Sequence, residues 1–317
     1  MSAPSPRPSI LEIAPYIGGE AHAPGATRQI RLASNEGALG TSPRVIEALR
    51  GAAAESFRYP DGGSAELRQA LSRHYDLDPD RLVIGNGSDE LLHLLAHAYA
   101  GEGTEVIHTA HGFLVYPIAA MAAGATPVVV PERNLTADVD AILAAVTPET
   151  RIVFLANPNN PTGSYLSAAE IARLHAGLPE QVLLVLDAAY AEFVDAPDYS
   201  AGHELVRRFD NVVVTHTFSK IYALGGLRLG WIDAPEAIIS VLHRVRGPFN
   251  VNLLAQVAGL AALEDRAFVE RARAHNHTWR AWLADALKGL GLTPHPSVGN
   301  FVLVSFKDRP GQKNGDA

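Results

Sequence analysis

The chain has 317 residues, of which 47% are hydrophobic and 19% are charged, and its formal net charge is −8. This length allows one large domain or two smaller ones, and the low charge content argues against a disordered protein. The acidic balance argues against a nucleic-acid or anionic-membrane partner, and the lack of cysteine excludes disulfides, thiolate catalysis and cysteine-ligated zinc.

The N-terminal stretch "MSAPSPRPS" is polar and proline-rich, and it lacks the apolar core of a signal peptide. The longest mostly apolar stretch, residues 118–130, is too short to span a bilayer and contains Gly124 and Pro127. These two observations predict a soluble, cytoplasmic protein.

Short β-branched runs alternate with amphipathic stretches over most of the chain. The predicted strands are residues 81–85, 105–109, 127–130, 151–156, 182–187 and 211–217, and the predicted helices are residues 88–100, 116–123, 137–146 and 168–178. Continuous apolar strands between helices predict an α/β fold with a largely parallel sheet covered on both faces. After residue 234 the pattern becomes mainly helical, with a long run at 263–290 and a strand at 301–306, which predicts a second, smaller domain.

Ligands of open α/β sheets bind beyond the carboxyl ends of the strands. That rule selects four segments here, residues 87–89, 157–163, 187–190 and 217–220. We therefore expect these segments to meet in one cleft.

Two of these segments allow an ordinary structural reading as well as a functional one. Ser88 and Asp89 lead into a helix, where they are either a common N-cap or a phosphate site built on free N–H groups. The segment "NPNNPTG", residues 157–163, is either a polar turn or a set of amides that bond a ligand.

Charged side chains follow the other two strands. Asp187 ends an apolar strand, where it is either a structural cap or the partner of a cation such as the ring nitrogen of pyridoxal phosphate. Tyr190 could then donate to the ring hydroxyl. Lys220 is either a surface lysine or a desolvated amine able to form a Schiff base, and Arg228 either forms an ion pair or holds a phosphate.

Taken together, "NPNNPTG", "LDAAYAEF", "TFSK" and "GGLRLG" resemble the fold-type-I, pyridoxal-phosphate-dependent aminotransferases. The segments "LASNEGALGTSP", "YPDGGSAELRQAL", "GNGSDELL" and "GPFNVN" are similar to those of histidinol-phosphate aminotransferases, and the resemblance extends to about Phe306. It implies a large domain with a mostly parallel seven-stranded sheet at 34–247. It also implies an N-terminal arm with part of the small domain at 1–33, and a small, incomplete α/β domain at 248–317.

The resemblance also implies roles for individual residues. Lys220 would be the Schiff-base lysine and proton shuttle, and Asp187 would pair with the pyridinium nitrogen. Asn160 and Tyr190 would bond the ring oxygen, and Phe113 would stack on the ring. The residues implied at the cofactor phosphate are Ser88, Asp89, Thr217, Ser219 and Arg228.

Three more residues are implied at the edges of this site. Tyr59 would reach the cofactor phosphate of a neighbouring subunit, which implies a homodimer with shared active sites. Tyr16 and Asn35 would lie near the substrate. The implied reaction converts L-histidinol phosphate and 2-oxoglutarate to imidazole-acetol phosphate and L-glutamate, in histidine biosynthesis.

The sequence departs from this family's pattern in two ways. Gly37 and Ala38 replace the usual Asn-Pro, and "AHGF" replaces a more common Pro-Thr, so an aromatic amino acid is an alternative substrate. Beyond Phe306 nothing matches the family's substrate-binding arginine, so we expect a truncated chain and keep a pyridoxal-phosphate-binding protein without turnover as an alternative. A decarboxylase of the same fold is a further alternative, because its cofactor site would look alike.

His93 and His97 stand four residues apart on a predicted helix, a spacing that can bind a metal. No third ligand is obvious, so we predict no metal site. The chain also lacks a Walker lysine motif and a G-x-G-x-x-G in a strand-turn-helix setting, which argues against nucleotide binding.

Overall fold

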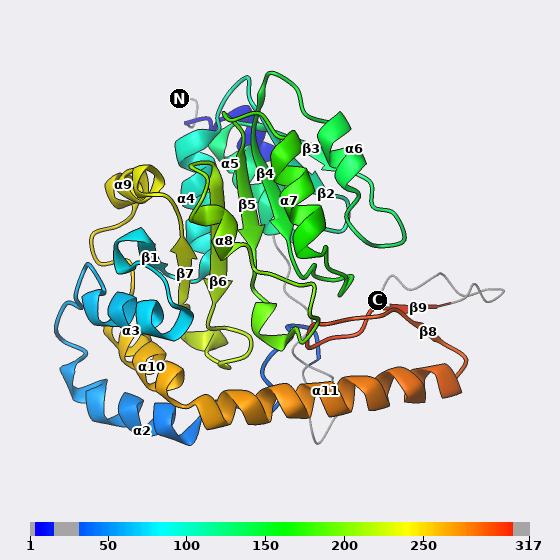
Figure 1. Cartoon of the computed structure of the whole chain (residues 1–317). Helices are drawn as coiled ribbons and strands as arrows, with labels where there is room; N and C mark the ends of the chain where they lie inside the picture. The colour runs from blue at the N-terminus through cyan, green and yellow to red at the C-terminus, as the bar shows by residue number, and fades with distance from the viewer. Residues whose placement is uncertain (1–3, 16–31, 307–317) are drawn as a thin grey trace.

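The computed structural model describes residues 4–15 and 32–306, and its centre is a seven-stranded sheet in the order β1-β7-β6-β5-β4-β2-β3 (Figure 1). Neighbouring strands pair in parallel except β7, which runs antiparallel to both β1 and β6. The strands are β1 Leu82–Gly85, β2 Glu105–Thr109, β3 Thr126–Val130, β4 Thr150–Ala156, β5 Leu183–Asp187, β6 Val212–Thr217 and β7 Gly230–Asp233. The predicted α/β class and mostly parallel sheet are confirmed, whereas the four-residue strand β7 was not predicted.

Helices cover both faces of the sheet (Figure 1). One face packs against α4 Ser88–Tyr99, α5 Val115–Ala123 and α9 Glu236–Val245. The other packs against α6 Val139–Ala144, α7 Ala168–Gly177 and α8 His203–Val206. Because side chains alternate along a strand, Val213 of β6 packs in the apolar cluster on the first of these faces, and Val214 packs in the apolar cluster on the second.

A third apolar cluster lies at the β1 and β7 end of the sheet. It joins α2 Pro43–Ala52, α3 Ala65–Tyr75 and α10 Leu253–Glu264 to Leu82 of β1 and Trp231 of β7. Trp231 is among the largest fully buried side chains of the described residues. Burial of this indole alone contributes on the order of 2–3 kcal/mol to folding.

The longest helix, α11 Arg266–Gly289, runs along one end of the molecule towards a small hairpin of β8 Thr293–Pro294 and β9 Val304–Ser305 (Figure 1). The sequence predicted a helix from residue 263, but Asp265 ends that stretch by capping the backbone N–H of Phe268 at 3.1 Å, so α10 and α11 are separate. The predicted strand at 301–306 is shorter than expected, because only Val304 and Ser305 pair with β8.

The remaining helical segments are short. They are α1 Pro8–Leu11 and the 3-10 turns Ala53–Glu55, Pro79–Arg81, Ala191–Phe193 and Gly225–Leu227. Across residues 4–15 and 32–306, no helix combines the length and apolar character needed to cross a bilayer.

Candidate functional site

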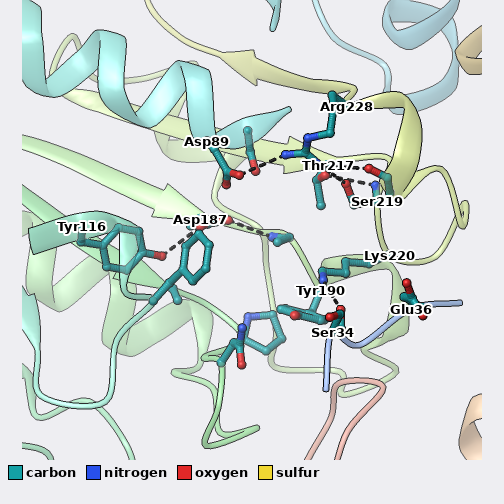
Figure 2. Close-up of a pocket in the computed structure, with 17 residues that line it drawn as sticks. Ser34, Glu36, Asp89, Tyr116, Asp187, Tyr190, Thr217, Ser219, Lys220 and Arg228 are labelled. Atoms are coloured by element: carbon teal, nitrogen blue, oxygen red, sulfur yellow. Dashed lines mark hydrogen bonds and ion pairs between the residues drawn. The ribbon is translucent and has the colours of Figure 1, made fainter. Parts of the chain in front are cut away.

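A cavity of about 260 Å³ opens at the carboxyl edge of the sheet, and each of the four segments selected from the sequence contributes to it (Figure 2). Arg228, Thr217 and Ser219 gather at one side, while Lys220 lies nearer Tyr190 and Ser34. The predicted residues that line the cavity are Ser88, Asp89, Phe113, Asn160, Asp187, Tyr190, Thr217, Ser219, Lys220 and Arg228.

Lys220 follows the end of β6 by three residues and projects its amine into the cavity. Its Nζ donates to the carbonyl oxygen of Ser34 at 3.1 Å and lies 5.6 Å from the centroid of the Tyr190 ring. Burial lowers the pKa of Lys220 below its ordinary value, and the positive charge of Arg228 lowers it further. The nearby carboxylates that oppose this shift belong to Asp89, Asp187 and Glu36.

Asp187 ends β5 and is only 4% exposed. Its Oδ2 accepts from the Tyr116 hydroxyl at 2.9 Å, and its Oδ1 accepts from the Ala189 N–H at 3.2 Å. Burial raises the pKa of Asp187 to about 6, and the Tyr116 hydrogen bond acts in the opposite direction. No basic side chain within the described ranges forms an ion pair with it, so this buried carboxylate suits a cationic ligand atom.

The first turn of α4 forms a cradle for an anion. Gly87 precedes the helix with φ +83°, and no side chain of the described residues caps the N–H groups that begin at Ser88. A Cβ at position 87 would lie 2.6 Å from Arg228 Nη2, and one at Gly230 would lie 2.3 Å from the Ser88 nitrogen. Both glycines therefore let backbone and guanidinium approach the same small space, where helix N–H groups favour phosphate.

Arg228 completes this cradle from the loop after Lys220. Its Nη1 donates to Ser219 Oγ at 3.4 Å, and its Nη2 forms an ion pair with Asp89 Oδ2 at 3.0 Å. Ser219 N donates to Thr217 Oγ1 at 3.1 Å, which brings the two hydroxyl side chains to the same side of the loop. A planar fork beside two hydroxyls and free helix N–H groups has the chemistry of a phosphate site.

The opposite side of the cavity carries groups suited to a flat ring. Tyr190 is buried, its hydroxyl accepts from Asn35 Nδ2 at 3.1 Å, and burial raises the pKa of Tyr190 to about 12. Asn160 and Phe113 line the cavity, and Phe113 meets the ring of Tyr116 edge-on at 5.9 Å. The donor set as a whole therefore fits pyridoxal phosphate.

Of three other residues named from the sequence, Tyr59 and His93 lie away from the cavity and Tyr16 is not among the described residues. Tyr59 is 81% exposed and stacks on Phe249 with 4.7 Å between ring centroids, and it does not line the cavity. Tyr16 lies outside the described residues. His93 contacts the carbonyl oxygen of Asp89 at 2.9 Å, and the described ranges hold no cluster of three side chains suited to a metal.

Sequence reasoning missed the partner of Asp187. Tyr116 is fully buried in α5, and its hydroxyl needs a partner there. The available signal was a tyrosine three residues after Phe113 in an otherwise apolar helix. Ser34, whose carbonyl oxygen binds Lys220, carried no signal because any residue supplies a carbonyl group.

The family profile "Aminotransferase class I and II" matches residues 27–314. The chain belongs to the class I and II aminotransferases. This family uses pyridoxal phosphate and acts on small-molecule substrates, so the resemblance seen in the sequence motifs is confirmed. The predicted aminotransferase class and cofactor are likewise those of the family.

Curated relatives of this aminotransferase sharpen the comparison. A histidinol-phosphate aminotransferase of Rhodospirillum centenum is 64% identical over 96% of the chain and 84% of the relative. One of Paramagnetospirillum magneticum is 59% identical over 100% of the chain and 87% of the relative.

Solved structures agree with the fold of this aminotransferase. Histidinol-phosphate aminotransferase from Sinorhizobium meliloti, in complex with pyridoxal-5'-phosphate, superposes with a TM-score of 0.83 at 32% identity over 86% of this chain and 74% of that one. Aspartate aminotransferase from Thermus thermophilus, with maleate, gives a TM-score of 0.78 at 27% identity over 86% of this chain and 76% of that one.

Proposed function

We propose that this aminotransferase converts L-histidinol phosphate and 2-oxoglutarate to imidazole-acetol phosphate and L-glutamate, in the histidine pathway of the cytoplasm. The observation that carries the proposal is the joint placement of Lys220, Asp187 and the start of α4 around one cavity. The choice of substrate rests on the names of relatives that are 52–64% identical.

When bound, pyridoxal phosphate supplies an aldehyde for covalent attachment of amines and a ring that accepts electrons. Lys220 would hold the cofactor at that aldehyde and would transfer the proton at the substrate Cα. A lysine with a lowered pKa is neutral for a larger fraction of the time near neutral pH, and only a neutral amine can take a proton. Asp187, held by Tyr116, would keep the ring nitrogen protonated.

The other lining residues would orient the cofactor. The N–H groups of Ser88 and Asp89 and the side chains of Thr217, Ser219 and Arg228 would hold its phosphate. Asn160 and Tyr190 would bond the ring oxygen, and Phe113 would lie against the ring. Together these contacts would fix the ring relative to the Lys220 amine, and such positioning contributes much of the catalysis by a bound cofactor.

We assign the remaining predicted residues to a homodimer and to the substrate. Tyr59 and Phe249 form an exposed aromatic pair, which suits a surface that meets a second copy, and Tyr59 would reach that copy's cofactor phosphate. Asn35 contacts the Tyr190 hydroxyl, and we assign it a place beside the substrate on that side of the cavity. Tyr16 would approach the substrate from the N-terminal arm.

The test is a visible spectrum of the chain purified with pyridoxal phosphate, recorded before and after adding L-histidinol phosphate. We expect a cofactor band that is absent in Lys220→Ala and that bleaches on adding the donor, with L-glutamate formed once 2-oxoglutarate is present. Phenylalanine and tyrosine are the comparison donors, and bleaching by these alone would replace the proposed substrate with an aromatic one. Release of carbon dioxide from phenylalanine or tyrosine, without formation of L-glutamate, would indicate a decarboxylase. A band that no donor bleaches would indicate binding without turnover.

A further inference from the structure

Behind the cofactor cavity, on the other face of β6, four ionisable side chains form an unbroken row. His203 Nδ1 lies 2.7 Å from Asp233 Oδ2, and His203 Nε2 lies 3.1 Å from His216 Nε2. His216 Nδ1 lies 3.0 Å from Glu192 Oε1. We call Asp233, His203, His216 and Glu192 the buried proton chain. Because side chains alternate along a strand, His216 points away from the face that Thr217 presents to the cavity.

The three contacts of this chain fix the number of protons in it. Each hydrogen bond needs one proton between its two heavy atoms, so three protons are required. Two neutral imidazoles bring one N–H proton each, and two ionised carboxylates bring none. The arrangement therefore holds one proton more than neutral histidines with ionised Asp233 and Glu192 would supply.

The surroundings favour His216 as the holder of the extra proton. The His203 ring lies 5.8 Å from the indole of Trp231, farther than the His216 ring, so we take His203 as the neutral acceptor in the contact between the two rings. The His216 ring lies parallel to the indole of Trp231, with 4.3 Å between centroids and 3° between planes, which stabilises a cation. Its side chain is 2% exposed and that of Glu192 is 8% exposed, so the two opposite charges lie together in a region of low dielectric.

Glu192 connects this chain to the cofactor site. It lies in the 3-10 turn two residues after Tyr190, at the end of the segment that begins with Asp187. The Tyr75 hydroxyl of α3 donates to Glu192 Oε1 at 3.0 Å, and Arg273 Nε of α11 donates to the Glu192 carbonyl oxygen at 2.8 Å. Groups from α3, β6 and α11 thus hold one residue of the turn that directly follows Asp187 and Tyr190, both of which line the cavity.

We propose that His216 is held as an imidazolium within the buried proton chain and is a positioning residue for the turn that follows Asp187 and Tyr190. The proton count stands on the geometry alone, whereas the effect on catalysis rests on the proposed function. Burial raises the pKa of Asp187 to about 6, and a positive charge on His216 acts to lower it, so the chain also favours the ionised form of Asp187.

Other ionisable groups surround the chain and bear on its pH dependence. Tyr222 contacts the Tyr75 hydroxyl at 3.1 Å, and burial raises the pKa of both tyrosines. Other charged or titratable groups line a neighbouring cavity or act on the buried proton chain at short range. They are His74, Tyr199, Arg266, Glu270, Arg273 and Glu204. These outer groups carry charges of both signs, so we expect their effects on the protonation of His216 to oppose one another.

The first test counts protons directly by nuclear magnetic resonance of the ¹⁵N-histidine-labelled chain at pH 7.5, with and without pyridoxal phosphate. The His216 signals are assigned by their loss in His216→Gln, or by their shift in Glu192→Gln if the first variant does not fold. We expect both ring nitrogens of His216 to carry protons and His203 to carry one, on Nδ1. A His216 ring with one bare nitrogen would overturn the proposal.

The second test compares turnover in His216→Gln with that in His175→Gln. His175 is a matched control because it is a half-buried histidine on α7 that bonds the Asn211 side chain at 2.9 Å and forms no hydrogen bond with a member of the buried proton chain. We expect kcat to fall about 10-fold in His216→Gln with KM nearly unchanged, as for residues that orient the groups in direct contact with a cofactor. The pH dependence of the cofactor band should also move in His216→Gln and not in the control.

These readouts separate the two proposals. Wild-type protein that turns over no donor would contradict the proposed function. The protonation of His216 would then be tested by the nuclear magnetic resonance measurement alone. Active wild-type protein with unchanged kcat and an unchanged band in His216→Gln would reject the positioning role. A variant that lost only thermal stability, with the pH dependence of its band unchanged, would likewise reduce His216 to a packing residue.

Discussion

The cofactor cavity and helix α11 differ in which side chains they bury and which they expose. In the cavity, polar groups such as Asp187 and Thr217 are almost fully buried at the ends of central strands. In α11, a helix of 24 residues, the buried side chains are Phe268 and Val269, while Trp282 is 59% exposed. The cavity therefore depends on polar groups held in place by the sheet, and α11 presents apolar groups that the described residues leave in solvent.

This contrast predicts where substitutions should have the largest effects on activity and stability. A buried polar group has few alternatives to its present partners, so its loss changes chemistry or leaves an unpaired atom. An exposed aromatic side chain makes few contacts in the folded state, so its loss changes little. Four substitutions test this contrast, from the largest expected effect to the smallest.

Lys220→Ala should reduce transamination at least about 10³-fold, because it removes the group to which we assign both the covalent attachment of the cofactor and the proton transfer. Steady-state rates with L-histidinol phosphate would measure the loss. Lys288→Ala is the matched control, since that lysine is exposed on α11 and pairs with Asp285. Activity of Lys220→Ala within tenfold of wild type would remove Lys220 from the reaction.

Arg228→Lys should weaken binding of pyridoxal phosphate about 10-fold while leaving the fold intact. Lysine keeps the charge but lacks the planar fork that reaches both Ser219 and Asp89. Equilibrium titration with the cofactor would give the two dissociation constants. Arg173→Lys, at a surface ion pair with Asp140, should leave that constant unchanged, and equal constants for both variants would contradict a phosphate role for Arg228.

Tyr116→Phe should raise the pKa of Asp187 further in the cofactor-free chain, because the Tyr116 hydroxyl stabilises the ionised form. The folded pKa is about 6 and the ordinary value is 3.8, so stability from this group is present below pH 3.8 and is lost as pH rises through 6. The variant should lose about 1–3 kcal/mol of unfolding free energy at pH 7.5 and less at pH 4.5.

Urea unfolding at the two pH values would measure this difference. Tyr99→Phe, which has no hydrogen bond to a carboxylate among the described residues, serves as the control and should show equal losses at both pH values. The same pattern in Tyr116→Phe would mean that its hydroxyl has no influence on the Asp187 carboxylate.

Trp282→Gln should have the smallest effect, within about 0.5 kcal/mol in unfolding free energy and about twofold in rate. Its indole is 59% exposed and packs edge-on against Trp279 at 5.4 Å, itself half exposed. Thermal unfolding and steady-state rates would check both values. A large loss would show that this face of α11 is covered in solution, and the contrast with the cavity would fail.

Much of the fold and of the cavity could be predicted from the sequence, because period and position carry physical meaning. The strand ending at Asp187 is a continuous apolar run, and such runs identify central parallel strands. Since parallel strands end at the same edge of a sheet, the sequence alone was enough to predict that Asp187 and Lys220 lie in one cleft. The roles of these residues and the domain boundaries at 33 and 247 stay predictions.

What the sequence could not predict depends on contacts between distant segments. Strand β7 has only two apolar side chains, Trp231 and Ile232, between Gly230 and Asp233, and it follows a glycine-rich loop, so no apolar run marks it. The Tyr116–Asp187 bond joins residues 71 positions apart, and the His203–His216 contact depends on α8 packing behind β6. No local pattern reports such pairs, because each residue alone is compatible with several environments.

Gly230 has a consequence for how mutational screens of this protein should be interpreted. Any side chain there would meet the backbone nitrogen of Ser88 at 2.3 Å, so even alanine would displace the start of α4. In a saturation screen, substitutions at position 230 should therefore reduce activity as severely as substitutions at position 220, although glycine has no reactive side chain. Small side chains should be tolerated at neighbouring Asp89 and Thr217 if those residues only leave space. Intolerance there would indicate that their side chains bind the ligand.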